Sequence, residues 1–328
     1  MVPPKDLFSV CINCRTYNQS VFIQDALDGF TAQQTTFPFL TILIDDASTD
    51  GEQDCIEAYV TRSFGHGNDA IMERWETDDA RWIYARHDEN VNAYFLVVLL
   101  NHNLFRNPKK SELIAGWTNV KYVAICEGDD YWTDPLKLQK QVDFLEHNPD
   151  YSLCFTNCKV SDGKSSRKGN SYIWDTYSTQ EMLLHNSLGL KKRKDIVVSP
   201  GHTATVVYRK PLTPRPDWIS KCFIGDEPFF IWISTFGKAK FINDMTSVYR
   251  QGVGISSANF SFVQDSLDRI KMYKMIDLGL EYKYHRLISR DIIAKYYYSL
   301  VKRSFKQNDY LKAVKFFLGY LFHKSGLA

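Results

Sequence analysis

The chain has 328 residues, of which 44% are hydrophobic and 24% are charged, and these values exclude a disordered, collagen-like or disulfide-stapled chain. Forty Lys and Arg residues against 38 Asp and Glu residues give a net charge of +2, so no overall positive field favours nucleic acid as a partner. At this length we expect one large domain or two modest ones.

The N-terminal residues lack a basic stretch leading into an apolar one, and the longest apolar runs are shorter than the roughly 20 residues that a membrane-spanning helix needs. We therefore expect a cytoplasmic protein whose seven cysteines remain reduced thiols. Two pairs, Cys11/Cys14 and Cys154/Cys158, have gaps that also occur in zinc sites. Both pairs lie in strand-like runs, so we favour buried thiols over a metal site.

Strand-like and helix-like stretches alternate through the first half of the chain. Hydrophobic patterns predict strands over residues 8–14, 39–44, 81–85, 121–126 and 151–156. They predict helices over residues 22–30, 53–62, 92–105 and 134–147. Asp134 and Pro135 suit the N-cap and first turn of the last helix. Strands separated by helices indicate an α/β fold with a mainly parallel sheet, which binds ligands at the carboxyl ends of its strands.

A polar stretch follows these elements. Residues 159–177 are rich in Ser, Gly, Lys and Asp and predict a mobile loop or lid. Ser178 and Glu181 have the spacing of a capping box that opens a short helix. The basic run 191–194 matches either a nuclear signal or, as we favour, a solvated loop.

Further strands and a helix are predicted before the C-terminal part. Residues 203–208 alternate like a strand, and a helix begins at Asp226 and stops at Gly237. Phe241 and Val248 belong to short strands.

The remainder of the chain has a helical pattern. Apolar stripes along residues 288–301 and 311–321, separated by a polar break, predict a helical hairpin. We therefore divide the chain into an α/β domain, residues 1–260, and a C-terminal helical extension, residues 261–328.

Three acidic groups follow predicted strands or begin a helix: Asp45/Asp46, Glu127/Asp129/Asp130 and Asp226/Glu227. Neighbouring carboxylates repel one another unless a cation or a proton donor lies among them. A divalent ion held by one or two carboxylates and by substrate phosphates meets that demand. We find neither a Gly-x4-Gly-Lys-Ser/Thr loop nor a Gly-x-Gly-x-x-Gly turn, so phosphate binding would depend on the metal. The alternative is that these acids are solvated turn residues and helix caps.

Several motifs along the chain resemble those of one protein family in their order and spacing. They are Ser9–Asn18, Ile44–Gly51, Cys126–Pro135 and Lys137–Val142. Together they resemble a family 2 glycosyltransferase, over about residues 7–257. The resemblance implies the GT-A fold and an inverting transferase that uses a nucleotide-diphosphate sugar, which we expect to be a UDP-sugar, with Mn²⁺ or Mg²⁺. Such enzymes commonly build bacterial surface polysaccharides.

The resemblance also implies which residues hold the nucleotide. Thr16, Tyr17, Asp45 and Asp46 match positions that bind the base, where a carboxylate accepts the uracil N–H. Glu127 stands at the first position of the family's Asp-x-Asp motif, which faces the ribose. This position holds a glutamate here, one methylene longer than the family's aspartate.

Metal and catalytic roles are implied in the same way. Asp129 matches the metal ligand at the diphosphate, and Asp130 is expected to share the ion. Asp226 matches the catalytic base, with Glu227 as the fallback candidate. Arg250 matches a diphosphate contact. The base would take the proton of an acceptor hydroxyl, on a saccharide or a lipid-linked acceptor, while the metal stabilises the charge of the leaving diphosphate.

Two other classes of protein use related scaffolds. A nucleotidyltransferase would be expected to carry a Gly-rich, Arg- or Lys-bearing phosphate loop after its first strand, and residues 15–18 lack one. A non-catalytic nucleotide- or sugar-binding or assembly protein is the second alternative, and the presence of Asp129 and Asp226 argues against it. His202 and Trp132 each have a ligand-binding and a structural interpretation, whereas Trp232 fits the core.

The C-terminal stretch is strongly basic. Residues 281–328 carry a net charge of +7, which leaves −5 for the rest of the chain. Aromatic residues lie between the lysines. Two interpretations stay open: peripheral contact with an anionic membrane at its inner face, where a lipid-linked acceptor would reside, or a hairpin packed on the catalytic domain or on a protein partner.

Overall fold

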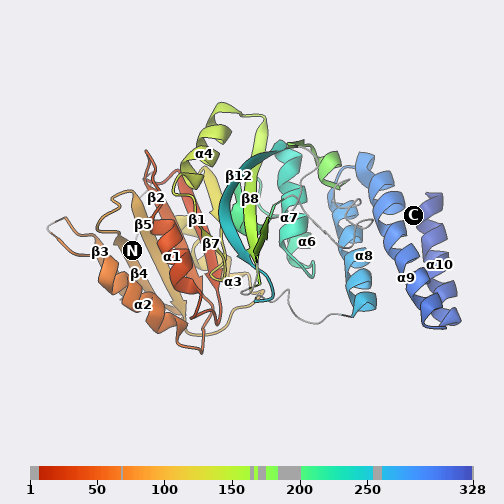
Figure 1. The fold of residues 1–328 in the computed structure, drawn as a ribbon, viewed down its shortest axis with the longest axis horizontal. Helices are drawn as coiled ribbons and strands as arrows, with labels where there is room; N and C mark the ends of the chain where they lie inside the picture. The colour runs from red at the N-terminus through yellow and green to blue at the C-terminus, as the bar shows by residue number, and fades with distance from the viewer. Residues whose placement is uncertain are drawn as a thin grey trace. The chain divides into compact units, whose positions relative to one another are not determined.

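The computed structural model describes residues 7–67, 69–162, 166–168, 175–183, 201–253 and 261–326. The chain divides into two compact units, whose elements Figure 1 shows. The sheet unit comprises Met1–Gly169, Gly201–Lys210 and Lys240–Ser257, and the helical unit comprises Asn170–Pro200, Pro211–Ala239 and Ala258–Ala328. Helix α7 (Asp226–Ile233) thus groups with the C-terminal helices. The expected domain boundary at residue 260 stays a prediction.

The sheet unit is built on one mixed β-sheet. Its strands are β1 (Val10–Thr16), β2 (Phe39–Asp45), β3 (Met72–Glu76), β4 (Ala80–Arg86), β5 (Ala93–Leu100), β6 (Tyr122–Ile125), β7 (Tyr131–Trp132), β8 (Tyr151–Ser161), β9 (Ser166–Lys168), β11 (Val206–Arg209) and β12 (Lys238–Arg250). They lie in the order β12-β8-β11-β6-β1-β2-β5-β4-β3, with β7 beside β12 and β9 beside β8. The central strands β6, β1, β2 and β5 are parallel, as predicted.

Helical segments cover both faces of this sheet. They are α1 (Ile23–Thr31), α2 (Glu52–Ser63), α3 (Lys109–Leu113), α4 (Lys137–His147) and the 3₁₀ turns η1 (Ala115–Trp117) and η2 (Thr203–Thr205). Phe30, Tyr59 and Leu138, from α1, α2 and α4, pack on one face of the central strands. Ile114 and Trp117 pack on the other. Because both faces are covered by apolar side chains, the carboxyl edge of the central strands is where polar residues gather.

Two elements of the sheet differ from the prediction. Residues 92–105 do not form a helix, because Ala93–Leu100 is strand β5, fully buried and parallel to β2. A strand buried on both faces needs apolar residues at every position and therefore loses the alternation that identifies a strand. The edge strand β3 was not predicted, since its sequence carries Glu73, Arg74 and Glu76 in place of an apolar run.

Elements after residue 150 also differ from the prediction. The prediction of a loop over residues 159–177 is wrong in part, because β8 continues to Ser161 and pairs with β9. The short strands expected around Phe241 and Val248 are one continuous strand, β12. The capping box is confirmed: the Ser178 amide donates to Glu181 Oε2 at 2.7 Å. The basic run 191–194 lies outside the described residues.

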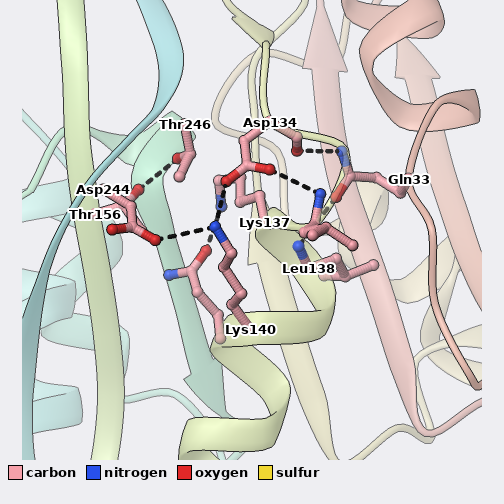
Figure 2. Close-up of polar contacts among 10 residues, drawn as sticks. Gln33, Asp134, Lys137, Leu138, Lys140, Thr156, Asp244 and Thr246 are labelled. Atoms are coloured by element: carbon pink, nitrogen blue, oxygen red, sulfur yellow. Dashed lines mark hydrogen bonds and ion pairs between the residues drawn. The ribbon is translucent and has the colours of Figure 1, made fainter.

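Helix α4 begins at Lys137, three residues later than predicted, and its start is anchored by side chains from other elements (Figure 2). Asp134 caps the turn before it by accepting from the Leu136 amide at 2.9 Å. The Gln33 side chain donates to the Asp134 carbonyl and accepts from the Leu138 amide, both at 3.0 Å. Lys140 pairs with Asp134 and with Asp244 of β12. These bonds fix the segment that directly follows Asp129 and Asp130.

The helical unit contains mainly helices, with the short strand β10 (Thr176–Tyr177). Its helices include α6 (Asp217–Ser220), α7, the 3₁₀ turns η3 (Ser234–Phe236) and η5 (Tyr282–Tyr284), α8 (Phe262–Gly279), the π-helix η6 (Leu287–Ile293), α9 (Ala294–Lys306) and α10 (Tyr310–Ser325). Ile231 of α7 packs in one core with Tyr273 of α8 and Ile292 of η6.

The predicted hairpin is confirmed by α9 and α10, which pack side by side (Figure 1). In the turn, Asn308 adopts a left-handed φ of 57°, a conformation that asparagine tolerates. Asp309 then caps α10 by accepting from the Lys312 amide at 3.1 Å. Within the described ranges, no helix combines the length and the hydropathy needed to cross a bilayer.

The cysteines bear out the prediction of buried thiols. Cys11, Cys14, Cys154 and Cys158 are all buried, and each is a thiol and not half of a disulfide. Burial raises the pKa of Cys154 to about 12, which keeps it a neutral thiol. In the described part of the chain, no group of three or more His, Cys, Asp or Glu side chains gathers around a point where an ion would fit.

Candidate functional site

The carboxyl ends of three parallel strands meet at one edge of the sheet. Thr16 at the end of β1 lies opposite Asp45 at the end of β2, and β1 pairs on its other side with β6. The Asp46 amide donates to the Thr16 carbonyl at 3.0 Å, and the Gly128 amide donates to the Arg15 carbonyl at 3.2 Å. The parallel register therefore brings three sequence segments, each following a different strand, into contact.

Gly128 is required by this contact. A Cβ atom at this position would lie 2.3 Å from Thr16 Oγ1 and 2.7 Å from Gln19 Oε1. Both distances are far inside van der Waals contact. The absence of a side chain at residue 128 therefore lets the acidic loop after β6 approach the loop after β1.

The buried carboxylate of Glu52 joins the loops that follow β1 and β2. It contacts the Thr16 hydroxyl and accepts from the Gln19 amide at 2.8 Å and from Ser48 Oγ at 2.9 Å. Burial raises its pKa. Glu52 was not among the residues predicted from the sequence. Its signal is its place in the first helical turn after a turn-forming segment rich in Ser, Thr and Asp.

Each of the two loops contains a residue with left-handed backbone, and the one in the second loop is an alanine. Asn18 has a φ of 54° and Ala47 a φ of 61°, and for alanine a left-handed conformation costs about 1–2 kcal/mol. Cross-loop hydrogen bonds hold them: the Asn18 amide donates to Ser48 Oγ, and the Thr49 amide donates to Asn18 Oδ1, both at 2.8 Å. Backbone strain that surrounding bonds maintain is typical of binding sites.

The two aspartates at the end of β2 have different surroundings. Asp46 uses both oxygens within the protein, accepting from Lys110 Nζ at 2.5 Å and from the Leu104 amide at 2.7 Å. Asp45 is fully buried, and its Oδ1 accepts from Ser48 N and Gln53 Nε2. Its Oδ2 has no hydrogen-bond partner among the described residues. Asp45 therefore retains an acceptor oxygen that no described residue uses.

Asp129 and Asp130 are adjacent buried carboxylates, 7% and 1% exposed. Burial raises the pKa of Asp129, and burial together with the negative charge of Asp129 raises the pKa of Asp130 well above its usual range. Asp130 Oδ1 accepts from the Arg250 amide at 2.8 Å, whereas the buried Oδ2 has no partner in the described structure. Glu127 is exposed, with Thr203 Oγ1 at 3.5 Å from its carboxylate.

These acidic side chains fit a hard divalent cation only as a partial ligand set. Asp129 and Asp130 supply oxygen donors, and the buried Asp130 Oδ2, which has no partner among the described residues, is available as a ligand atom. Two carboxylates are fewer ligands than an all-protein site contains. They match the way Mg²⁺ and related ions are held jointly by the protein and by substrate phosphates.

Arg250 has several partners beside the acidic loop. Its guanidinium lies between the rings of Phe22 and Tyr131, at 4.9 and 4.5 Å from their centroids. It pairs with Asp25 and donates to the Asp129 carbonyl at 2.7 Å. Arg250 therefore fixes the loop that carries Asp129, and its expected contact with a diphosphate stays a prediction.

The aromatic residues considered as ligand contacts differ in their exposure to solvent. Trp132 is 3% exposed and donates to the Ala204 carbonyl at 2.8 Å, so its structural interpretation is confirmed. Trp232 is 7% exposed in the helical unit, as expected for a core residue. His202 stacks on Tyr249, with centroids 4.3 Å apart. Tyr17 is 43% exposed beside Thr16 and presents a ring to solvent at the carboxyl edge.

In the helical unit, Asp226 and Glu227 begin helix α7 but differ in environment. Glu227 is 1% exposed, contacts the Tyr273 hydroxyl and pairs with Arg269 Nη1 at 3.2 Å. Burial raises its pKa to about 7. Asp226 is exposed, and its Oδ1 accepts from the Glu227 amide at 2.9 Å. Glu227 thus anchors α7 to α8, while the carboxylate of Asp226 faces solvent.

The sequence has relatives among mycobacterial proteins. No known family profile matches the chain. Uncharacterized proteins of Mycobacterium tuberculosis and Mycobacterium bovis are 35% identical over 198 residues, which is 60% of this chain and 45% of those proteins. The match therefore spans less than half the length of these relatives.

Solved structures show a clear likeness of fold. TarS 1–349 of S. aureus in complex with UDP-GlcNAc aligns over 96% of this chain and 81% of its own, with a TM-score of 0.60 and 14% identity. The mannosyltransferase PcManGT from Pyrobaculum calidifontis, in complex with GDP-Man and Mn²⁺, aligns over 86% and 67%, with a TM-score of 0.51 and 13% identity. The predicted fold, a GT-A-like mainly parallel sheet with a C-terminal helical region, is confirmed.

Proposed function

We propose that this chain transfers a sugar from a nucleotide-diphosphate donor, a UDP-sugar in our assignment, to a hydroxyl of a saccharide or lipid-linked acceptor. The observation that carries the proposal is the meeting of Thr16, Asp45 and Asp129 at the carboxyl edge of the parallel strands. Two buried carboxylate oxygens there, Asp45 Oδ2 and Asp130 Oδ2, have no partner in the described structure. In α/β sheets this edge is where nucleotides bind.

One group of side chains suits the nucleoside part of the donor, and another suits its diphosphate. Asp45, with a spare acceptor fixed by Ser48 and Gln53, suits the N–H of a pyrimidine base. Tyr17 follows Thr16, the residue opposite Asp45 in the sheet, and its exposed ring suits stacking on that base. Glu127, exposed after β6, suits the ribose hydroxyls.

Asp129 and Asp130 are the residues that would hold Mn²⁺ or Mg²⁺. When bound, the ion would supply charge stabilisation for the departing diphosphate. At the site for the cation and the diphosphate, both carboxylates are buried, and Arg250 fixes the loop that carries them. A buried pair of carboxylates with raised pKa values favours a cation that restores the charge balance.

We assign the general base to Asp226. It would accept the proton of the acceptor hydroxyl at a carboxylate oxygen while the hydroxyl oxygen bonds to the anomeric carbon. Attack from the face opposite the leaving diphosphate inverts the anomeric configuration. Glu227 is the weaker candidate, because its carboxylate is buried between Arg269 and Tyr273 and has no solvent-facing atom with which to reach an acceptor.

A thermal-shift screen of nucleoside diphosphates, with and without Mn²⁺, tests the donor assignment. We expect UDP together with Mn²⁺ to raise the melting temperature more than either ligand alone, because each binds the folded state. Asp129→Asn should lose the metal-dependent part, and the exposed Asp143→Asn on α4 is the matched control. Stabilisation by another nucleotide and not by UDP would overturn the UDP assignment.

A further inference from the structure

Helix α10 has apolar residues on two opposite sides, and only one side is packed. Ala313, Phe316 and His323 face the protein and are at most 7% exposed. The other side, which we call the outer face of α10, consists of Leu311, Val314, Phe317, Leu318, Leu321 and Phe322, between 44% and 87% exposed. The apolar stripe predicted from the sequence is therefore the exposed side of the helix.

This exposure is unusual in extent. Each outer-face side chain is large and apolar, and together they occupy successive turns of one helix. Phe305 at the end of α9 and Tyr310 at the start of α10, 54% and 60% exposed, extend the same apolar surface. Soluble surfaces rarely leave so continuous an apolar patch open unless something covers it.

The outer face is bordered by positive charge. On a helical wheel, Lys315 and Lys324 lie at its two edges, and no Asp or Glu follows Asp309. Helix α9, which packs against α10, carries three further cations in its C-terminal half, Lys302, Arg303 and Lys306. Among described residues, none of these five cations lies within 4 Å of a carboxylate; the pair between Lys312 and Asp309, at 2.7 Å, is the exception on α10.

We infer that the outer face of α10 binds the surface of an anionic lipid bilayer, with the helix lying in the plane of the membrane. Sixteen residues span about 24 Å, shorter than the roughly 30 Å hydrocarbon core. An apolar face edged by lysines is the pattern of an interfacial helix, since lysine stems extend along the apolar layer while their charges reach the lipid phosphates.

The positive charge beside the outer face favours an anionic bilayer over a second copy of this chain as its binding partner. In a two-fold dimer the same surface meets itself, so the lysine borders of two copies would lie close together with no described acidic residue of α10 beyond Asp309 to pair with them. Like charges at an interface oppose association. An anionic bilayer offers both an apolar interior and negative phosphates. The inference concerns the helical unit alone and does not depend on the proposed sugar transfer.

Vesicle flotation of the full chain tests this inference. We expect the protein to float with vesicles that contain phosphatidylglycerol, and to float much less with phosphatidylcholine alone or at high salt. The double variant Leu311→Asn/Leu318→Asn should weaken binding by more than about tenfold, because two side chains lose their burial in the apolar layer. Leu278→Asn is the matched control, since Leu278 on α8 is 89% exposed but lies outside the outer face.

Charge variants test the border separately. Lys315→Gln/Lys324→Gln should weaken binding to phosphatidylglycerol vesicles roughly 30-fold, because each lysine contributes about 1 kcal/mol near an anionic surface. Lys271→Gln, an exposed lysine of α8, should leave it unchanged. All the substituted side chains are exposed, so circular dichroism should show the same fold for each variant.

Three results would overturn the inference. Absence of flotation with both kinds of vesicle, from a monomeric protein, would leave a protein partner as the occupant. Flotation that survives the leucine substitutions would place the contact elsewhere on the chain. A dimer in sedimentation velocity that Leu311→Asn/Leu318→Asn dissolves, without vesicle binding, would identify a second copy as the occupant.

Discussion

Two sets of buried carboxylates, one in each unit of the molecule, differ in what surrounds them. In the sheet unit, Asp45 and Asp130 each keep one buried oxygen without a partner in the described structure. In the helical unit, Glu227 is buried just as deeply but contacts Tyr273 and pairs with Arg269. Burying an acid costs free energy in both places. Among the described residues, Asp45 and Asp130 thus differ from Glu227 in keeping an oxygen without a partner. We expect this missing partner, rather than burial itself, to mark a carboxylate that binds a ligand.

Substitution of Asp226 should have the largest effect on activity. Asp226→Asn removes the proton acceptor with little change in shape, so kcat for sugar transfer should fall by about 10²–10⁴ while UDP affinity stays unchanged. Glu227→Gln, one residue away, should retain clearly more activity in the folded fraction. A larger loss of kcat from Glu227→Gln than from Asp226→Asn, at equal folded content, would reverse the two roles.

Asp129→Asn should have the next largest effect, on cation binding. Removing one of two carboxylates should weaken Mn²⁺ binding in the presence of UDP by about 10–100-fold or more. Electron paramagnetic resonance of free Mn²⁺ measures this directly. Asp143→Asn, exposed on α4, should bind like the wild type. Unchanged Mn²⁺ binding by Asp129→Asn would remove this residue from the cation site.

Gly128→Ala should affect both stability and binding more modestly. Its Cβ would be 2.3 Å from Thr16 Oγ1, so the loops must separate, at a cost of about 1–3 kcal/mol in the free energy of unfolding. Gly225→Ala is the control, since no atom lies within 4 Å of the added carbon. Chemical denaturation compares the two. Equal stability of both variants would show that the approach of the two loops is not tight in solution.

The smallest expected effect is on how the stability of the chain depends on pH, and it concerns the buried Glu227 of the helical unit. Burial raises the pKa of Glu227 from 4.5 to about 7, so the folded chain holds a proton there that the unfolded chain releases. The stability that the folded chain gains from holding this proton is present at low pH and is lost as pH rises through about 7. The melting temperature of Glu227→Gln should therefore improve relative to wild type between about pH 5 and about pH 8. Exposed Glu281→Gln is the control, and a constant difference between wild type and Glu227→Gln would contradict the assignment.

Much of the fold was predictable because its strands and helices follow simple periodicities. The five predicted strands before residue 157 all exist, and so does the C-terminal hairpin. The predicted helix over 92–105 was wrong because β5 is buried on both faces and its uniform apolar run contains no periodicity. For α10 the sequence predicted the stripe but not which side of the helix packs, since Ala313 and Phe316 contribute the packed side.

The positions of the candidate residues in the sheet were predictable, whereas their hydrogen-bond and salt-bridge partners were not. Strand order and motif spacing located Thr16, Asp45 and Asp129 at one edge. The salt bridge of Lys110 with Asp46 joins residues 64 positions apart, and no local pattern indicates it. The same holds for the contact of Arg250 with Asp25. Which oxygens remain without partners depends on such long-range contacts, so it emerges only from the folded chain.

Calorimetric titration of UDP into the wild-type chain, with and without Mn²⁺, tests the central claim most directly. The account predicts binding that is much tighter with the ion present, because Asp129 and Asp130 otherwise repel the diphosphate. Equal affinity with and without a divalent cation, or no binding of UDP under either condition, would contradict it.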